Sequence, residues 1–245
     1  MSHIHIPDGV FPTWLVIAGW ILTLGILYLC IRSVRNAGLE HRLPIIGIVS
    51  ALMIVGMTLE IVPIAYHINM SVIAGIVLGP ALGFISVFIV DLIIAMFGHG
   101  GITVVGLNTL VVGAEAVLGF YLFRAFCGVL SRGRLSVGFS SALATVFSLI
   151  LSTSLMIGII YVSQVNPERV LYKNRQPNIE ETIPQKEHGD NERYPAKDGK
   201  IDIGVFAKTV FFLGVFGWIL ESVITGFVIG YVSRVRPDLI FSDVT

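Results

Sequence analysis

The stretch INMSVIAGIVLGPALGFISVFIVDLIIAMF, residues 68–97, decides the fold class. It is almost wholly apolar, and as one helix at 1.5 Å per residue it would be about 45 Å long. The hydrocarbon core of a bilayer is only about 30 Å thick. Gly79-Pro80 and Gly83 interrupt the run near its middle, and such residues break helices. The stretch therefore predicts two short helices hinged at Gly79-Pro80, inside a membrane and buried by neighbouring protein.

The composition of the whole chain agrees with a membrane protein. Of 245 residues, 55% are hydrophobic and only 13% are charged, whereas a soluble domain carries about a quarter charged residues. The mean hydropathy is +0.86. The net charge is zero, and a nucleic-acid partner normally requires a basic face. We therefore expect the lipid bilayer, and no nucleic acid, as a partner.

Apolar runs long enough to cross a bilayer recur along the chain. Besides residues 68–97 they cover residues 11–31, 43–65, 106–130, 137–162 and 203–232. With the broken run counted as two, the sequence predicts an all-α protein with about seven transmembrane helices. Six of them form a membrane bundle over residues 11–166, and residues 203–245 hold the final helix and a tail.

Basic residues in short loops indicate the orientation. With the N-terminus outside, the cytoplasmic ends would receive Arg32, Arg35, Arg42, Arg124, Arg132, Arg134, Arg234 and Arg236. The connections around residues 66–68 and 98–105 contain no Lys or Arg and would lie outside. The sequence thus predicts an N-out, C-in, multi-pass protein of the plasma membrane. The polar segment 167–202 would be an extracytoplasmic loop, because it has no core to bury.

Four of the six histidines fall on the predicted outer side. His3 and His5 lie at the N-terminus, and His67 and His99 flank the broken helix pair. Imidazoles converging on one side of so apolar a protein indicate a transition-metal site. The alternative is that each histidine is merely interfacial.

The N-terminal segment 1–10 has no basic region before an apolar stretch, so we expect it to persist as an extracytoplasmic metal-chelating segment. If Met1 is removed, the amine of Ser2, the next amide and the His3 imidazole supply three nitrogens in one plane. Such a set suits Ni(II), Cu(II) or Co(II), and His67 would supply the fourth ligand. If Met1 stays, the terminus could provide all four nitrogens and exclude His67. The sequence leaves both arrangements open.

Carboxylates within the apolar runs are costly and often mark pathways; they are Glu60, Asp91, Glu115 and Glu221. Asp91 could hydrogen-bond within the hairpin toward His99. The alternative is that each carboxyl only joins neighbouring helices. The segment His99-Gly100-Gly101-Ile102-Thr103 has no following Lys-Ser/Thr, so it is not a phosphate-binding loop. A metallopeptidase pattern such as H-E-x-x-H is absent, which makes an enzyme the weakest class.

Three pieces of the sequence together resemble a known family. His5-Ile6-Pro7-Asp8-Gly9 is similar to the N-terminal motif of cobalt/nickel transporter subunits of the CbiM/NikM type, which belong to energy-coupling-factor transporters. His67 with the following Gly79-Pro80 run resembles the second metal-binding histidine and its hairpin. His99–Thr103 with Asn108 resembles the segment H-G-G-[LI]-T…N.

The resemblance implies a substrate-capture subunit for Co(II) or Ni(II), with no prosthetic group and no catalytic residue. Its partners would be a transmembrane coupling subunit, ATPase subunits and a small accessory membrane subunit. The metal would be bound by Ser2, His3, His5 and His67, with His99, Asn108 and Asp91 as supporting residues. Two other functions stay open: a metal-binding sensor or scaffold, and a channel or secondary transporter that uses Asp91, Glu115 and Glu221.

Two departures from the family affect the ligand set. Four residues precede His5 where relatives have one, so either His3 chelates with His5 in support, or His5 binds without an adjacent terminal amine. The residues around His67, Ala65 to Asn69, also differ from the Ser/Cys-rich approach and following Thr/Gly of relatives. This second difference bears on the groups that support the metal ligands, and hence on metal preference.

Overall fold

The computed structural model describes residues 8–35, 43–58, 67–98, 100–130, 134–163 and 203–241. These residues form helices and no strand, which confirms the predicted all-α class for this part of the chain. The helices are α1 (Thr13–Val34), α2 (Leu43–Thr58), α3 (Ser71–Leu78), α4 (Pro80–Met96), α5 (Val105–Val129), α6 (Arg134–Ser163), α8 (Ile203–Val235) and α9 (Pro237–Phe241).

The predicted break in the long apolar run is confirmed. Gly79 separates α3 from α4 with φ 84°, a left-handed conformation that favours glycine, and Pro80 is the first residue of α4. At 1.5 Å per residue α3 is about 12 Å long, and α4 is about 25 Å long. The run therefore forms a helix of about two turns followed by a longer helix of 17 residues.

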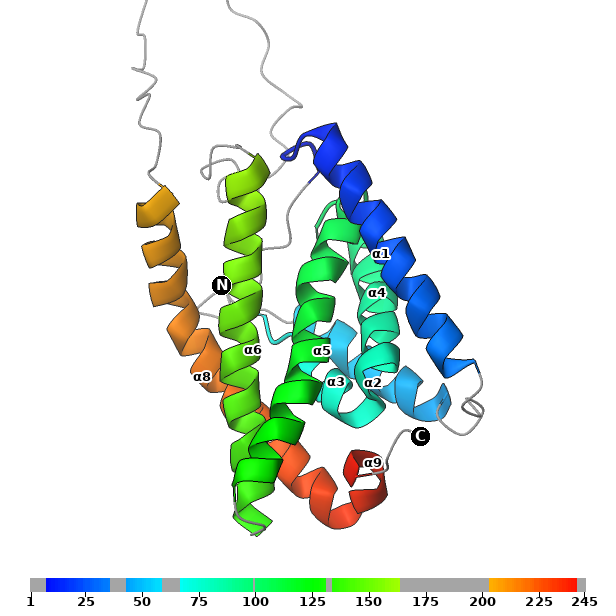
Figure 1. Ribbon diagram of the computed structural model, residues 1–245, viewed down its shortest axis with the longest axis vertical. Coiled ribbons are helices and arrows are strands. Elements are labelled where there is room, and N and C mark those ends of the chain that lie inside the picture. Colours follow the sequence, from blue (N-terminus) through cyan, green and yellow to red (C-terminus); the bar gives the residue numbers. More distant parts are fainter. Residues whose placement is uncertain are drawn as a thin grey trace, which may run out of the picture.

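Four helices are long and apolar enough to cross a membrane, namely α1, α5, α6 and most of α8. The apolar helices α2 and α4 are shorter, with 16 and 17 residues. Figure 1 shows α1, α4, α5, α6 and α8 running along the long axis of one bundle. The described residues thus contain four long apolar helices and two shorter ones, and α3, with eight residues, is too short to cross a bilayer. The number of crossings and the N-out orientation stay predictions.

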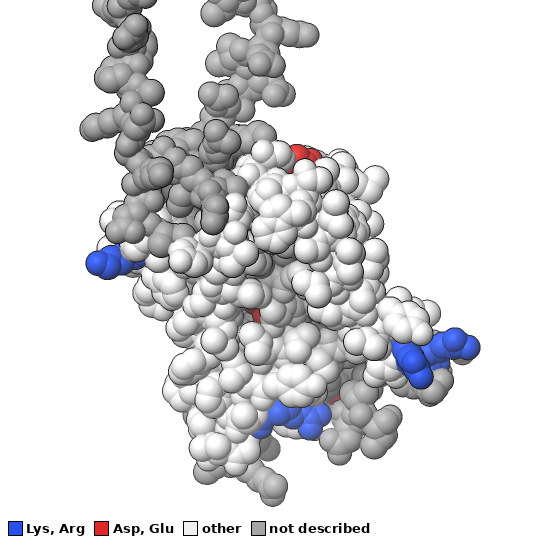
Figure 2. All heavy atoms as spheres, turned by 45° about the horizontal axis from the view of Figure 1, so that its top comes forward, with Lys and Arg blue, Asp and Glu red and all other residues white. Residues whose placement is uncertain are grey.

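The outer surface of the bundle is apolar. Figure 2 shows a broad uncharged face, with Lys and Arg at its margins. Large side chains such as Ile21, Tyr28 and Phe212 are 63–70% exposed on the long helices. Such a surface in water would be an aggregation liability, whereas lipid covers it at no cost. Membrane location follows from this surface together with the helix lengths.

Close backbone contacts hold α3 between α4 and α5. A Cβ built on Gly75 would lie 1.9 Å from the carbonyl oxygen of Ala116, so only glycine fits at this crossing of α3 and α5. A Cβ on Gly83 of α4 would lie 3.0 Å from the Cα of Gly75. Small residues at crossings are the usual packing device between membrane helices. These close contacts hold α3 in place, although a helix of eight residues has little stability of its own.

The C-terminal tail contains a helix that the hydropathy pattern did not predict. After α8, Arg236 and Pro237 lead into α9, whose Ile240 is 3% exposed. Ile240 belongs to a buried cluster with Val72, Ile73 and Ile76 of α3. A five-residue helix is too short for a periodic signal, so only its tertiary contact reveals it.

Candidate metal centre

Only part of the predicted ligand set falls within the described residues. Ser2, His3, His5 and His99 lie outside them, whereas His67, Asp91 and Asn108 lie inside. The described residues contain no group of three or more His, Cys, Asp or Glu that could hold a metal ion. The described part of the chain can therefore contribute His67 to a metal site but does not complete one.

Asp8 ties the N-terminal segment to the loop before α5. The backbone N–H of Ile102 donates to Asp8 Oδ2 over 3.1 Å, and the N–H of Thr103 donates to Asp8 Oδ1 over 2.9 Å. The Thr103 hydroxyl also donates to Oδ1. A Cβ on Gly101 would lie 2.2 Å from Asp8 Oδ1, so the loop admits Asp8 only because residue 101 is glycine. Asp8 is thus attached to the end of the bundle that carries this loop.

The same loop is held from α1. Trp20 Nε1–H donates to the Thr103 carbonyl over 2.7 Å, and the Thr23 hydroxyl donates to the Gly106 carbonyl over 2.6 Å. In Figure 1 the starts of α1, α5 and α8 and the end of α6 gather at one end of the bundle. Apolar residues pack there in a buried cluster that joins Val10 to Val104 and Phe206. The hydrogen bonds of Asp8 to residues 102 and 103, called the Asp8 anchor below, therefore lie beside a packed apolar cluster.

His67 lies on a non-helical segment, residues 67–70, that packs against α2. The Ile68 N–H donates to the Gly56 carbonyl over 3.2 Å. A Cβ on Gly56 would lie 2.6 Å from the Ile68 carbonyl oxygen, so this approach also requires glycine. The His67 residue is half-buried. The chain enters α3 directly after this segment, through Met70 in the left-handed conformation at φ 57°.

A buried polar network attaches this segment to α5. Asn69 Nδ2 donates to Glu115 Oε2 over 2.6 Å and to Ser71 Oγ over 3.1 Å. The Ser71 hydroxyl donates to the same Glu115 oxygen over 2.7 Å. All three residues are at most 1% exposed. Glu115 therefore binds polar groups at the start of α3, which supports the interhelical alternative for this carboxylate.

The network also indicates how far the Asn69 side chain reaches into the bundle; the external position predicted for the connection around residues 66–68 stays a prediction. Glu115 stands ten residues after Val105, the first residue of α5. Along the helix axis this is about 15 Å inward from the end that carries the Asp8 anchor. Because Asn69 touches Glu115, the buried Asn69 side chain reaches about this depth, whereas His67, Ile68 and Met70 are half-buried.

Of the two proposed supporting residues in the described part, Asp91 makes a contact between helices. Asp91 Oδ2 accepts a hydrogen bond of 3.0 Å from the Thr109 hydroxyl, and these residues are 2% and 0% exposed. This bond joins α4 to α5, whereas the suggested contact of Asp91 toward His99 lies outside the described residues. Asn108 is also buried, with 6% exposure. Asn69 and Ser71 were not among the predicted site residues, although they are polar residues at the edge of an apolar run.

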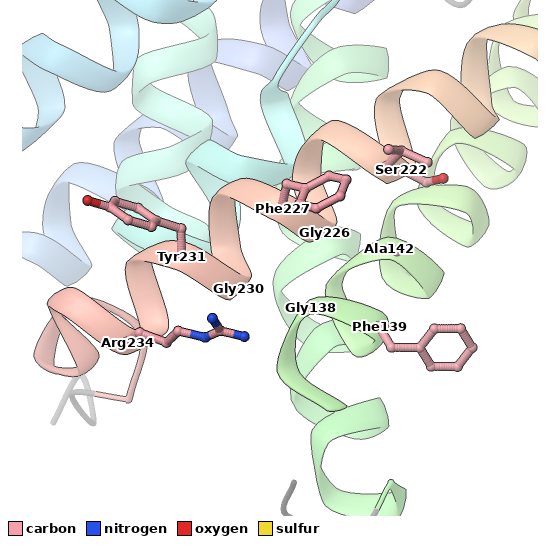
Figure 3. Close-up of a pocket in the computed structure, with 10 residues that line it drawn as sticks. Gly138, Phe139, Ala142, Ser222, Gly226, Phe227, Gly230, Tyr231 and Arg234 are labelled. Atoms are coloured by element: carbon pink, nitrogen blue, oxygen red, sulfur yellow. The ribbon is translucent and has the colours of Figure 1, made fainter. Parts of the chain in front are cut away.

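A groove between α6 and α8 is a separate feature of the surface (Figure 3). Its volume is about 640 Å³, and it is lined by Gly138, Phe139, Ala142, Ser222, Val223, Gly226, Phe227, Gly230, Tyr231 and Arg234. None of these ten described residues is His, Cys, Asp or Glu. The groove therefore lacks the usual ligands of a divalent transition metal and is not the candidate site.

Known proteins share both the sequence and the fold of this chain. A protein of Haloquadratum walsbyi described as "Putative metal transport protein" is 28% identical over 212 residues, which are 71% of this chain and 97% of that relative. A protein of Haemophilus influenzae with the same description is 29% identical over 126 residues, 49% of this chain and 58% of that relative.

Two crystal structures have a similar fold. One, described as a truncated transition metal transporter, has a TM-score of 0.66 at 18% identity and covers 94% of this chain and 98% of its own. The other, described as a transition metal transporter, has a TM-score of 0.65 at 20% identity and covers 94% and 93%. At these identities the likeness shows the fold alone. The model of the CbiM family, "Cobalt uptake substrate-specific transmembrane region", matches residues 5–239, and the chain therefore belongs to this family of membrane proteins for metal uptake.

Proposed function

We propose that this protein is the substrate-capture subunit of an ATP-driven transporter for Co(II) or Ni(II) in the plasma membrane. The N-terminal segment binds the metal on the external side and closes against His67. A coupling subunit, ATPase subunits and a small accessory membrane subunit complete the transporter and supply the energy. The metal is cargo, and no prosthetic group takes part.

The observation that carries this proposal is the Asp8 anchor together with the depth of the His67 segment. Asp8 bonds to residues 102 and 103 at one end of the bundle, and Asn69 bonds to Glu115 about 15 Å inward along α5. An extended chain spans at most about 3.5 Å per residue. His5, three residues before Asp8, thus reaches about 10 Å, and His3 reaches about 17 Å. A reach of about 17 Å covers the depth of about 15 Å, whereas a reach of about 10 Å does not. The two reaches therefore favour His3 over His5 as the ligand that binds the metal together with His67.

The ligand set then follows from the chemistry of the terminus. With Met1 removed, the Ser2 amine, the His3 amide and the His3 imidazole give three nitrogens in a plane, and His67 gives the fourth. Four nitrogens suit Ni(II) and Co(II) better than Mg(II) or Ca(II), which prefer oxygen. Under this proposal His5 and His99 support the segment rather than bind the metal.

The alternative of a carboxylate relay receives less support. Glu115 accepts hydrogen bonds from Asn69 and Ser71, and Asp91 accepts one from Thr109. Interhelical hydrogen bonds of this kind stabilise a bundle without any transported proton. Uptake by this subunit therefore depends on partners rather than on the carboxylates.

Uptake of radiolabelled Co(II) and Ni(II) tests the proposal. Cells that lack other uptake systems receive this subunit alone, or together with coupling, ATPase and accessory subunits of a transporter of this kind. We expect accumulation only with the complete set, and loss of accumulation when the ATPase is inactivated. Equal accumulation by the subunit alone would refute the capture role. His67→Ala in the complete set should abolish uptake.

A further inference from the structure

The groove between α6 and α8 is an apolar hollow on the outer surface of the bundle (Figure 3). Glycines bring the two helices together beneath it: a Cβ on Gly138 would lie 2.9 Å from the carbonyl oxygen of Gly226. The aromatic residues Phe139, Phe227 and Tyr231 line the groove and are 58–75% exposed. An exposed apolar surface of this kind marks a site for a membrane or protein partner.

Arg234 gives one end of this groove a positive charge. It lies in the last turn of α8, and in Figure 3 its side chain points from α8 toward α6. Among the described residues Arg234 forms no ion pair, whereas Arg236, two residues later, donates three hydrogen bonds to Asp238. The guanidinium of Arg234 is therefore available to an anion from outside the protein.

The groove has the length of one lipid molecule. The apolar span Gly204–Val235 of α8 has 32 residues, or about 48 Å, and a bilayer with its headgroups is about 40–45 Å thick. Arg234, next to the end of this span, therefore lies at the level of the headgroups. Ser222, the lining residue of α8 farthest from Arg234, stands about 18 Å away along the axis. This length fits one leaflet of about 20–22 Å, whereas a partner's transmembrane helix would cross both leaflets.

We propose that the groove between α6 and α8 binds one anionic phospholipid, whose phosphate accepts hydrogen bonds from Arg234 and whose acyl chain lies along the groove beside Phe227. The forked N–H donors of a guanidinium match the oxygens of a phosphate. Basic pockets between transmembrane helices bind anionic lipid headgroups in the same way. The lipid site is separate from the proposed metal site, and it does not depend on which cation the protein carries.

Native mass spectrometry tests the headgroup contact. Purified protein in detergent is incubated with equal amounts of phosphatidylglycerol and phosphatidylcholine that carry the same acyl chains, and the first bound lipid is identified by its mass. Both lipids carry a phosphate, but the ammonium of phosphatidylcholine offsets its charge. We expect the wild type to bind phosphatidylglycerol about fivefold more often, the preference that one arginine near a charged lipid surface supplies. Arg234→Gln should remove this preference.

Two matched controls separate the groove from the rest of the surface. Arg236→Gln makes the same change of charge two residues away, at an exposed arginine that is already paired with Asp238, and should keep the preference. Phe227→Ala removes an exposed side chain that lines the groove, so it should lower the binding of both lipids. Phe212→Ala removes a phenyl ring of similar exposure, 70% against 75%, outside the groove on the same helix and should bind lipid like the wild type.

Three results would overturn the proposal. One is an unchanged preference for phosphatidylglycerol in Arg234→Gln, or an equal loss in Arg236→Gln, because net charge alone would then explain the binding. Another is equal lipid binding by Phe227→Ala and Phe212→Ala, which would place the acyl chain elsewhere. The third is a cross-link between Val223→Cys, in the groove, and another subunit of an assembled transporter, because a protein would then occupy the groove.

Discussion

Under the proposed function, replacing Asp8 should weaken metal binding, because the Asp8 carboxylate attaches the end of the proposed chelating segment to the bundle. Asp8 accepts hydrogen bonds from the N–H groups of Ile102 and Thr103 and from the Thr103 hydroxyl. The residue is exposed, so each bond is worth only about 1 kcal/mol net. Asp8→Ala therefore removes about 3 kcal/mol of docking energy, or roughly 100-fold in affinity at 1.4 kcal/mol per decade.

Asp8→Asn refines the prediction. One oxygen of the asparagine can still accept from the Thr103 N–H and hydroxyl, but the amide nitrogen would face the Ile102 N–H, donor against donor. The loss is then about one hydrogen bond, or up to roughly tenfold in affinity. The order of affinity should be wild type, Asp8→Asn, Asp8→Ala.

Calorimetric titration of the purified protein with Ni(II) measures these differences. Asp238→Ala is the matched control, because Asp238 is also exposed and also accepts hydrogen bonds, from Arg236 over 2.8–3.3 Å, but on α9. It should bind Ni(II) like the wild type. If Asp8→Ala bound Ni(II) as tightly as Asp238→Ala, the anchor would contribute nothing to the site and the reasoning would be refuted.

Three further predictions concern the terminus and the packing. Acetylating the mature N-terminus should abolish high-affinity Ni(II) binding while the circular dichroism stays helical; retained affinity would favour His5 with His67 over amine chelation. Gly101→Ala should weaken Ni(II) binding as Asp8→Ala does, because the new Cβ would lie 2.2 Å from Asp8 Oδ1 and would push the carboxylate away. A Gly101→Ala titration curve equal to that of the wild type would contradict this prediction. Gly75→Ala should destabilise the fold by about 1–3 kcal/mol or more through overpacking, since its Cβ would lie 1.9 Å from the Ala116 carbonyl oxygen. Thermal unfolding should show a lower midpoint for it than for Gly25→Ala, whose Cβ meets nothing within 4 Å.

Much of the fold could be predicted from local sequence. Helix length and apolarity located the long helices to within a few residues, because a membrane helix must satisfy its own backbone hydrogen bonds. The break at Gly79-Pro80 could also be predicted from local sequence, because glycine allows φ 84° and proline is favoured at the first position of a helix. In contrast, α9 depends on the contact of Ile240 with α3, which no local pattern contains.

The candidate site could be predicted only in part. The intramembrane position of Glu115 marked it as a residue with a partner, but Asn69 and Ser71 stand 46 and 44 residues away along the chain. Nothing in a single sequence pairs residues at that separation. The attachment of the segment that carries His67 to α5 could not be predicted for the same reason, because it depends on the bond between Asn69 and Glu115. Ser2, His3, His5 and His99 lie outside the described residues, so their role as ligands or supports stays a prediction.

The carboxylates of Asp8 and Glu115, which lie next to the proposed metal-binding segments, share one property: the protein itself supplies hydrogen-bond donors to them. Asp8 accepts from the loop before α5, and Glu115 accepts from Asn69 and Ser71. Carboxylates are the ligands that hard cations such as Mg(II) and Ca(II) require. With both engaged in this way, the groups offered to an incoming cation are mainly nitrogens, which favour Co(II) and Ni(II). The protein would then select against Mg(II) and Ca(II) in two ways: its own hydrogen-bond donors engage the carboxylates, and the proposed ligands of Co(II) or Ni(II) are imidazoles.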